Sequence, residues 1–114
     1  MVVAQGDVWW ADLTEPRGSE PGFRRPVVVV QGDAFNRSDI ATVVCVPLTT
    51  TMYLAESPGN IVLAARATKL PKDSVANISQ ITAFDREVLT EHVGRLSKEH
   101  LAAVLAGIDT LLGR

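Results

Sequence analysis

The chain has 114 residues, of which 46% are hydrophobic and 21% are charged, and its formal net charge is −2 at pH 7. This composition is that of a globular chain and excludes a disordered one, and the length suits a single domain that we expect to span residues 1–114. The slightly negative charge excludes a general polyanion binder, so any contact with nucleic acid must come from a local basic cluster.

The single cysteine indicates the compartment. Cys45 lies in the apolar run 43–46, and we expect it to be a buried structural thiol. One cysteine cannot form an internal disulfide, which fits a reducing environment. The N-terminal residues lack the basic start and apolar core of a signal peptide, and no apolar run has membrane-spanning length. We therefore expect a cytoplasmic protein with no membrane partner.

The first half of the chain predicts short strands. Aromatic and branched residues predict a strand over 6–13, and a loop over 17–26 then leads into consecutive valines at 27–30. A strand with one wet face would alternate apolar and polar residues. The uniform run instead predicts a strand over 27–31 that is buried on both sides and central to its sheet.

The second half predicts more strands and one clear helix. Strands are expected over 40–48, 61–65, 75–83 and 92–96, with a loop at 50–59, a connection at 66–73 and a helical turn capped by Asp85. The final helix has Ser97 as its N-cap and Gly113 just past its end. Its apolar residues share one predicted buried stripe: Leu101, Val104, Leu105, Ile108, Leu111 and Leu112. Closely spaced strands followed by one helix predict a small, mainly antiparallel barrel with the helix packed on it.

The loop before the valine run is the candidate site for chemistry. It carries Glu20 and the pair Arg24 and Arg25, and Pro26 would fix Arg25 at the mouth of the buried strand. A guanidinium held there can grip a phosphate through two parallel hydrogen bonds. If the second and third strands are neighbours, the hydroxyl of Thr49 can donate to the same phosphate. Charge alone favours a simpler alternative, a solvated loop with a surface ion pair.

Other signatures of chemistry are missing from the sequence. His92 and His100, the only histidines, fall on separate predicted elements with no cysteine nearby, so we expect no metal site. The glycines match no phosphate-binding motif and no nucleophile elbow is present, so we expect neither a nucleotide cofactor nor acyl hydrolysis. Trp9 and Trp10 could stack on bases, although on a strand they face opposite sides and at least one should be core.

Several segments, taken in order, resemble the MazF/PemK family of bacterial toxin endoribonucleases. No single segment is specific, but their order and spacing cover nearly the whole chain. They are Gly6-Asp-Val-Trp-Trp-Ala-Asp-Leu13, Gly18-Ser-Glu20, Arg24-Arg-Pro-Val-Val-Val-Val30, Asp33 with Phe35-Asn36, Val46-Pro-Leu-Thr49, Asp73-Ser-Val75, Ser79-Gln-Ile81 and Gly94-Arg-Leu96.

The resemblance implies an SH3-like barrel, a homodimer, and sequence-specific, metal-independent cleavage of single-stranded RNA. Attack by the ribose 2′-hydroxyl would leave 2′,3′-cyclic phosphate and 5′-hydroxyl ends. Arg25 and Thr49 match the usual catalytic pair of such proteins, and Glu20 matches a proposed third member, a general base. Further positions are implied to contact RNA: Ser19, Arg24, Asn36 and Gln80.

The resemblance also implies a partner and shows two departures. A MazE-like antitoxin would cover the basic RNA channel, including Arg24 and Arg25, with a flexible acidic tail. Many relatives carry an arginine after the Gln-Ile pair where this chain has Thr82, and often an asparagine where it has Gly32.

Two alternatives to a ribonuclease remain at this point. A gyrase poison of the CcdB type shares the barrel and acts by gripping a protein, but that family uses a tryptophan near its C-terminus. This chain ends Leu111-Leu112-Gly113-Arg114. A non-catalytic SH3-like interaction module is the second alternative, and the joint presence of Glu20, Arg25 and Thr49 argues against it.

Overall fold

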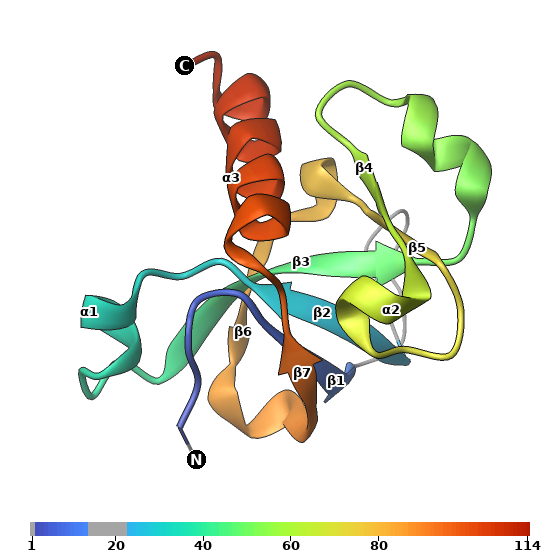
Figure 1. Ribbon diagram of the computed structural model, residues 1–114. Coiled ribbons are helices and arrows are strands. Elements are labelled where there is room, and N and C mark those ends of the chain that lie inside the picture. Colours follow the sequence, from blue (N-terminus) through green and yellow to red (C-terminus); the bar gives the residue numbers. More distant parts are fainter. Residues whose placement is uncertain (1, 14–22) are drawn as a thin grey trace.

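A computed structural model describes residues 2–13 and 23–114. Figure 1 shows how the elements of this part of the chain are arranged. In chain order they are β1 (Asp7–Asp12), β2 (Arg24–Val29), α1 (Asp33–Asn36), β3 (Thr42–Thr49), the 3-10 turn η1 (Met52–Glu56), β4 (Ile61–Leu63), α2 (Ala65–Thr68), β5 (Ser74–Ala76), η2 (Ile78–Gln80), β6 (Thr82–Asp85), η3 (Arg86–Val88), β7 (Leu89–Arg95) and α3 (Lys98–Leu112).

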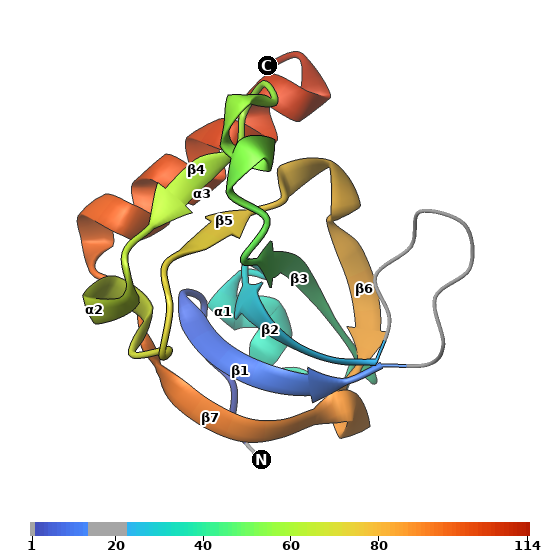
Figure 2. The ribbon, with the colours of Figure 1, turned by 90° about the vertical axis from the view of Figure 1, so that its right-hand side faces the viewer.

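The strands form one curved antiparallel sheet in the order β4-β5-β3-β2-β1-β7. Strand β3 pairs with β2 along one side, while on its other side β6 pairs with its first half and β5 with its end. Figure 2 shows the sheet curling around its interior with α3 laid against one side. The predicted small antiparallel barrel with a packed C-terminal helix is therefore confirmed.

The valine run of β2 separates two apolar clusters. Val28 and Val30 pack into one cluster that also contains Val104 of α3, whereas Val27 and Val29 pack into a second with Trp9. The side chains of residues 27–29 are fully buried. Because successive strand residues face opposite sides, both faces of β2 are covered, as the unbroken apolar run predicts. Trp9 and Trp10 likewise point into different clusters.

Helix α3 begins and ends as predicted but buries a shorter stripe. The Ser97 hydroxyl accepts a hydrogen bond from the His100 backbone N–H at 3.2 Å, and Gly113 closes the helix with a φ of 73°. Leu111 and Leu112 are 44% and 62% exposed, so the prediction that they lie in the buried stripe is wrong. The last turn of α3 extends beyond the sheet that the rest of the helix covers (Figure 1).

Three predicted strands extend further than expected because of tertiary pairing. β7 begins at Leu89 rather than at residue 92, since Leu89 and Glu91 pair with β1. β2 begins at Arg24 rather than at residue 27, since Arg24 and Arg25 pair with Asp12 and Ala11 of β1. β3 continues through Pro47 to Thr49. Pro47 has no N–H to donate, but its carbonyl accepts a hydrogen bond from the Asn77 N–H at 3.0 Å, so the sheet tolerates it.

The predicted strand over 75–83 is in fact split into β5, η2 and β6. Asn60 causes the break: its side-chain carbonyl accepts from the Ile78 N–H at 2.9 Å, and its amide donates to Asn77 Oδ1 at 3.3 Å. The chain turns there and moves from the end of β3 to its beginning. Helices α1 and α2 were not predicted, because four residues are too few to show helical periodicity. The single turn after Asp85 is present as η3, without a side-chain cap.

Cys45 is fully buried, and this burial raises the pKa of its thiol to about 12, so the expectation of a structural thiol is confirmed. Within residues 2–13 and 23–114, no helix combines the length and the apolar character needed to cross a bilayer.

Candidate active site

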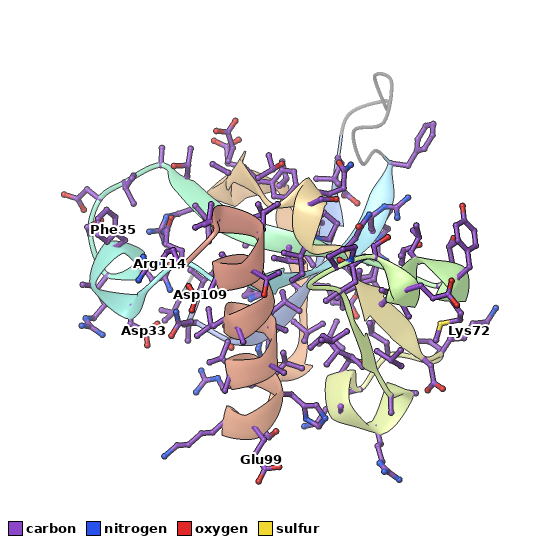
Figure 3. All side chains as sticks on the ribbon, turned by 90° about the horizontal axis from the view of Figure 1, so that it is seen from above. Asp33, Phe35, Lys72, Glu99, Asp109 and Arg114 are labelled. Carbon is purple, nitrogen blue, oxygen red and sulfur yellow. The ribbon has the colours of Figure 1, made fainter. Side chains whose placement is uncertain are left out.

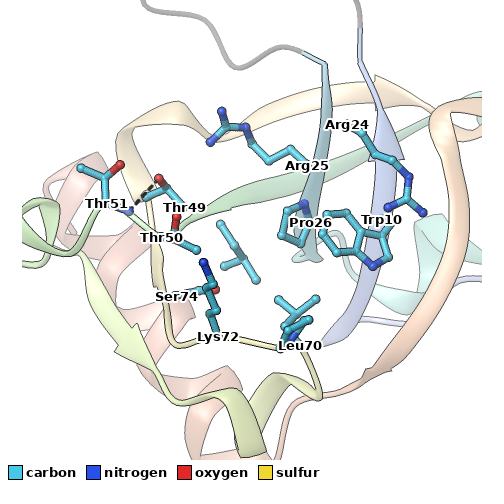
Figure 4. A pocket seen from close by; sticks show the side chains of 12 residues that line it. Trp10, Arg24, Arg25, Pro26, Thr49, Thr50, Thr51, Leu70, Lys72 and Ser74 are labelled. Atoms are coloured by element: carbon cyan, nitrogen blue, oxygen red, sulfur yellow. Dashed lines mark hydrogen bonds between the residues drawn. The ribbon is translucent and has the colours of Figure 1, made fainter.

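A cavity of about 410 Å³ opens at one end of the sheet, beside the start of β2 and the end of β3 (Figure 4). Its floor is apolar, with Leu48 and Leu70, and its rim is polar and basic. The lining residues are Trp10, Arg24, Arg25, Pro26, Leu48, Thr49, Thr50, Thr51, Leu70, Pro71, Lys72 and Ser74.

Arg25 and Thr49 are brought together by the register of β2 and β3. Val27 pairs with Pro47 in this antiparallel ladder. Arg25 lies two residues before Val27, and Thr49 lies two residues after Pro47. The two residues are therefore opposite each other where the ladder opens, and both line the cavity.

Arg25 is poised to receive a ligand. Its side chain is half-buried, its Nε is fully buried, and no described residue provides that N–H with a hydrogen-bond partner. Leaving a buried donor unsatisfied costs about 1–3 kcal/mol. The terminal N–H groups of the same guanidinium can bind an anionic oxygen in the cavity that Arg25 lines.

Thr49 presents a hydrogen-bond donor beside it. Its hydroxyl oxygen accepts from the Thr51 backbone N–H at 3.2 Å, the dashed line in Figure 4. This contact fixes the oxygen and leaves the O–H hydrogen free to donate. A phosphate oxygen in the cavity could then receive hydrogen bonds from two neighbouring strands.

Arg24 takes a different position from Arg25. Its guanidinium carbon lies 4.4 Å from the centre of the Trp10 ring, and it pairs with Glu91 at 3.2 Å and with Asp12 at 3.6 Å. These exposed pairs are weak individually, but with the stacking they hold the guanidinium flat on the indole. Arg24 and Trp10 together form a flat cationic platform on the rim.

The charge of the cavity selects for anions. Arg24, Arg25 and Lys72 line it, and none of the described lining residues is Asp or Glu. Within the described part of the chain, no three His, Cys, Asp or Glu side chains gather to form a metal-binding group. The cavity thus combines cations, hydroxyls and an aromatic face, the donor set that recognises a phosphate joined to a base.

The model of one protein family, described as "PemK-like, MazF-like toxin of type II toxin-antitoxin system", matches residues 4–112. This chain belongs to that family. Among similar proteins, Endoribonuclease MazF2 of Mycobacterium bovis is 40% identical over 112 residues, which are 98% of each chain. Endoribonuclease EndoA of Bacillus subtilis is 35% identical over 104 residues, covering 91% of this chain and 89% of that protein.

Solved structures agree with the MazF-like assignment. The crystal structure of MazF from Deinococcus radiodurans superimposes with a TM-score of 0.81 at 25% identity, covering 100% of this chain and 99% of that chain. An endoribonuclease in complex with its cognate antitoxin, from a mycobacterial species, has the same fold with a TM-score of 0.75 at 23% identity, covering 98% of this chain and 94% of that one.

Besides Arg24, the structure describes two of the other predicted site residues of this MazF-like toxin, and neither lines the cavity. Glu20 and Ser19 fall outside the described residues. Asn36 does not line the cavity: it is buried, donates to the Gln31 carbonyl at 2.9 Å and accepts from Gln31 Nε2 at 3.0 Å. In Figure 3, its helix α1, marked by Asp33 and Phe35, lies on the opposite side of α3 from Lys72. Gln80 is half-buried on η2 and does not line the cavity either. RNA contacts at these positions stay predictions.

Sequence reasoning missed Lys72 as a cavity residue and left the role of Trp10 undecided. Lys72 lies on the connection from α2 to β5, and in Figure 4 its side chain reaches toward the threonines at the end of β3. Nothing in its sequence neighbourhood distinguishes it from a surface lysine, since it is the fold that brings this connection to the cavity. Trp10 could have been recognised by pairing: it lies opposite Pro26, so its ring is next to the arginine pair.

Proposed function

We propose that this MazF-like toxin is an endoribonuclease that cleaves single-stranded RNA in the cavity shared by Arg25 and Thr49. The observation that carries the proposal is the position of the Arg25 guanidinium opposite a hydroxyl donor, across two neighbouring strands of one basic cavity. The family, and the endoribonuclease names of its curated relatives, supply the reaction class.

The substrate itself would supply the nucleophile. The ribose 2′-oxygen attacks the adjacent phosphorus, the bond from phosphorus to the 5′-oxygen breaks, and the products carry a 2′,3′-cyclic phosphate and a 5′-hydroxyl. The 2′-hydroxyl gives its proton to a base, and the departing 5′-oxygen takes one from solvent. Such a reaction needs neither a nucleophilic side chain nor a metal-bound water, so we propose a metal-independent enzyme.

Arg25 and Thr49 would act on charge that develops in the transition state. Negative charge grows on the phosphate oxygens as the phosphorus becomes five-coordinate. Arg25 neutralises it through its fork of N–H groups, and Thr49 donates to one of the same oxygens. An arginine holds its proton too firmly to be a useful acid at neutral pH, so its role is electrostatic. For Glu20, we propose the role of general base on the family resemblance.

The platform of Trp10 and Arg24 supports a single-stranded substrate. Bases that are free of a duplex can stack on aromatic rings and guanidinium planes, each contact stabilising binding by about 1–3 kcal/mol. Sequence specificity would arise from which base fits beside this platform. Within a duplex, the bases stack on one another and could not reach it.

Three further properties are proposed on the same basis. The partner would be a MazE-like antitoxin whose acidic tail competes with RNA for the cavity that Arg24, Arg25 and Lys72 make positive. This suits a family in which a mycobacterial endoribonuclease has been solved in complex with its cognate antitoxin. The assembly would be a homodimer, and the location would be the cytoplasm, where RNA and a reduced Cys45 occur together.

The test is to incubate the purified protein with a mixed RNA pool in EDTA and to map the chemistry of the cut ends. We expect cuts at one short motif, with 2′,3′-cyclic phosphate and 5′-hydroxyl termini. A second substrate with one 2′-deoxyribose at the cut site should resist cleavage. Cutting of that substrate, or ends with a 5′-phosphate, would contradict the mechanism, and an inert protein would favour a binding module.

A further inference from the structure

A second cavity of about 410 Å³ lies outside the active site, between helix α2, the end of β7 and the first turn of α3. Figure 2 shows these three elements side by side. We call it the α2–α3 pocket, and its lining residues are Ala64, Arg66, Ala67, Lys69, Arg95, Ser97 and His100. None of them lines the first cavity.

The α2–α3 pocket concentrates positive charge. Arg66, Lys69 and Arg95 line it, and no described Asp or Glu does, although the chain as a whole has a net charge of −2. Within residues 2–13 and 23–114, Arg66 and Lys69 form no ion pair. Bringing like charges together opposes folding, and an anion in the pocket would remove that repulsion.

A buried carboxylate, that of Asp7, holds the Arg95 side chain in place. Its Nε donates to Asp7 Oδ1 at 3.0 Å, and the Asp7 side chain is only 3% exposed. Asp7 also accepts hydrogen bonds from the Ala4 N–H and from Trp9 Nε1, so the carboxylate is itself fixed. The two terminal nitrogens of the Arg95 guanidinium are then available to a ligand. A pre-oriented fork loses less entropy on binding than a free surface arginine does.

His100 supplies a donor from the third element. Ser97 Oγ accepts the His100 backbone N–H at 3.2 Å and lies 2.9 Å from the ring Nδ1. In one of the two ring tautomers, the serine hydroxyl donates its hydrogen to Nδ1. The neutral ring then carries its hydrogen on Nε2, where it can donate to a ligand.

We propose that the α2–α3 pocket binds a phosphate of the RNA strand that flanks the cleaved linkage. The inference rests on the proposed function and extends its substrate beyond the first cavity. Donors arrive from α2, β7 and α3, so the ligand must accept hydrogen bonds from several directions. A tetrahedral phosphate suits such an arrangement better than a planar carboxylate does.

The two cavities are close enough for one strand. Lys69 lines the α2–α3 pocket, Lys72 lines the active site, and the two residues between them line the active site as well. Three peptide units span at most about 11 Å between the Cα atoms of Lys69 and Lys72. An RNA chain that leaves the active site past Lys72 would have only a short distance to cover to reach the α2–α3 pocket.

The test compares two double variants with the same charge change. Arg66→Gln with Lys69→Gln removes the two pocket cations that form no ion pair with a described residue, while Arg37→Gln with Arg114→Gln removes two exposed cations elsewhere. Each is assayed on a short RNA that spans only the cleaved linkage and on RNAs extended at either end. Binding of the same RNAs in uncleavable 2′-O-methyl form is measured in parallel, with thermal unfolding as the control for folding.

We expect the pocket variant to raise KM and Kd at least about fivefold for RNA extended at one end. Its kcat should be unchanged, and so should KM and Kd for the short RNA. Its slope of log Kd against log salt should fall by about 0.7, which is the contribution of one phosphate contact on a single strand. The control variant should keep the parental values.

Three outcomes would overturn the proposal. One is an equal loss of RNA binding in the pocket and control variants, which would indicate that the overall electrostatic field of the protein attracts RNA and not the pocket. Another is that the pocket variant binds short and extended RNAs more weakly by the same factor. The third is unchanged RNA binding with loss of binding to an oligoglutamate peptide, which would assign the pocket to an acidic protein segment. If the parent cleaves no RNA, the proposed function fails, and the 2′-O-methyl binding series still decides on the pocket.

Discussion

Arg25 and Thr49 stand opposite each other at the point where β2 and β3 separate, each two residues beyond the paired Val27 and Pro47. Strands β2 and β3 are central to the sheet and deeply buried, so the two side chains are mounted on the most rigid part of the fold. A site that must hold donors at a fixed distance gains from such a frame.

Replacing Arg25 should abolish most cleavage while leaving the fold intact. Loss of one donor to a developing oxyanion typically costs about 10²–10³ in rate, so we expect kcat for Arg25→Ala to fall at least that far. The variant also removes a buried N–H that has no hydrogen-bond partner among residues 2–13 and 23–114, so its thermal midpoint should not drop. Arg25→Lys, which keeps the charge but not the fork, should be intermediate. Parental activity of Arg25→Ala in single-turnover assays would disprove the assignment.

At Thr49, the hydroxyl rather than the side-chain shape should matter. We expect Thr49→Val to lose about 10²-fold or more in kcat, because it keeps the volume and removes the donor. Thr49→Ser should retain most activity, since it keeps the O–H and can still accept from the Thr51 N–H. If the serine and valine variants cleave RNA equally slowly, the methyl group is what matters and the proposed hydrogen bond is wrong.

Lys72 should affect substrate binding more than the chemical step. Lys72 lines the cavity but belongs to neither β2 nor β3. We therefore propose that its charge binds a phosphate next to the one that reacts. Lys72→Gln should raise KM severalfold and lower the salt dependence of binding by about 0.7, with kcat nearly unchanged. Lys72→Arg should restore binding. A large fall in kcat with constant KM would instead make Lys72 part of the reacting centre.

The close approach of α3 to the turn before β4 predicts a stability defect. A Cβ added at Gly107 would fall inside the contact distance of the Gly59 carbonyl oxygen, whereas one added at Gly32 meets nothing within 4 Å. We expect Gly107→Ala to destabilise the protein by about 1–3 kcal/mol, seen as a thermal midpoint lowered by several degrees. Gly32→Ala is the matched control. A midpoint equal to that of the control would mean that the helix moves away without cost.

The lowered pKa of Asp33 predicts that the fold loses stability at acid pH. Hydrogen bonds from the Gln5 backbone N–H and the Asn36 amide lower the pKa of this carboxyl from 3.8. A carboxyl whose folded pKa is lowered stabilises the fold above its unfolded value and loses that effect as pH falls through the folded value. Asp33→Asn should therefore be less stable than the parent at pH 7. The two should converge as the pH falls below 3.8 and through the lowered folded pKa, as urea unfolding would measure. A constant difference across this range would contradict the assignment.

Much of the fold was predictable because the sequence signals for the buried strand and the last helix are local. Consecutive valines indicate a doubly buried strand whatever surrounds them, and Ser97, Gly113 and an apolar stripe define a helix without tertiary information. The pairing of Arg25 with Thr49 needed one assumption, that the second and third strands are neighbours, and a short strand-to-strand connection makes that the usual outcome.

What could not be predicted depends on contacts between distant residues. The break between β5 and β6 is imposed by Asn60, which lies 18 residues before Ile78. Lys72 joins the cavity because α2 and its connection fold back over the sheet. The sequence distinguishes Arg24 from Arg25 but does not show its neighbours: β2 pairs with β1 and β1 with β7, which brings Trp10 and Glu91 next to Arg24. A sequence pattern does not record such partners.

The doubly buried valines of β2 also bear on how a toxin of this kind can diversify. A substitution at residues 27–29 disturbs packing on one face or the other, since none of these side chains reaches solvent. New target preferences must therefore arise where the strand emerges, around Trp10 and Arg24 and along the α2 connection, where side chains are partly exposed. Related toxins could in this way differ widely in the messages they destroy while sharing nearly the same interior.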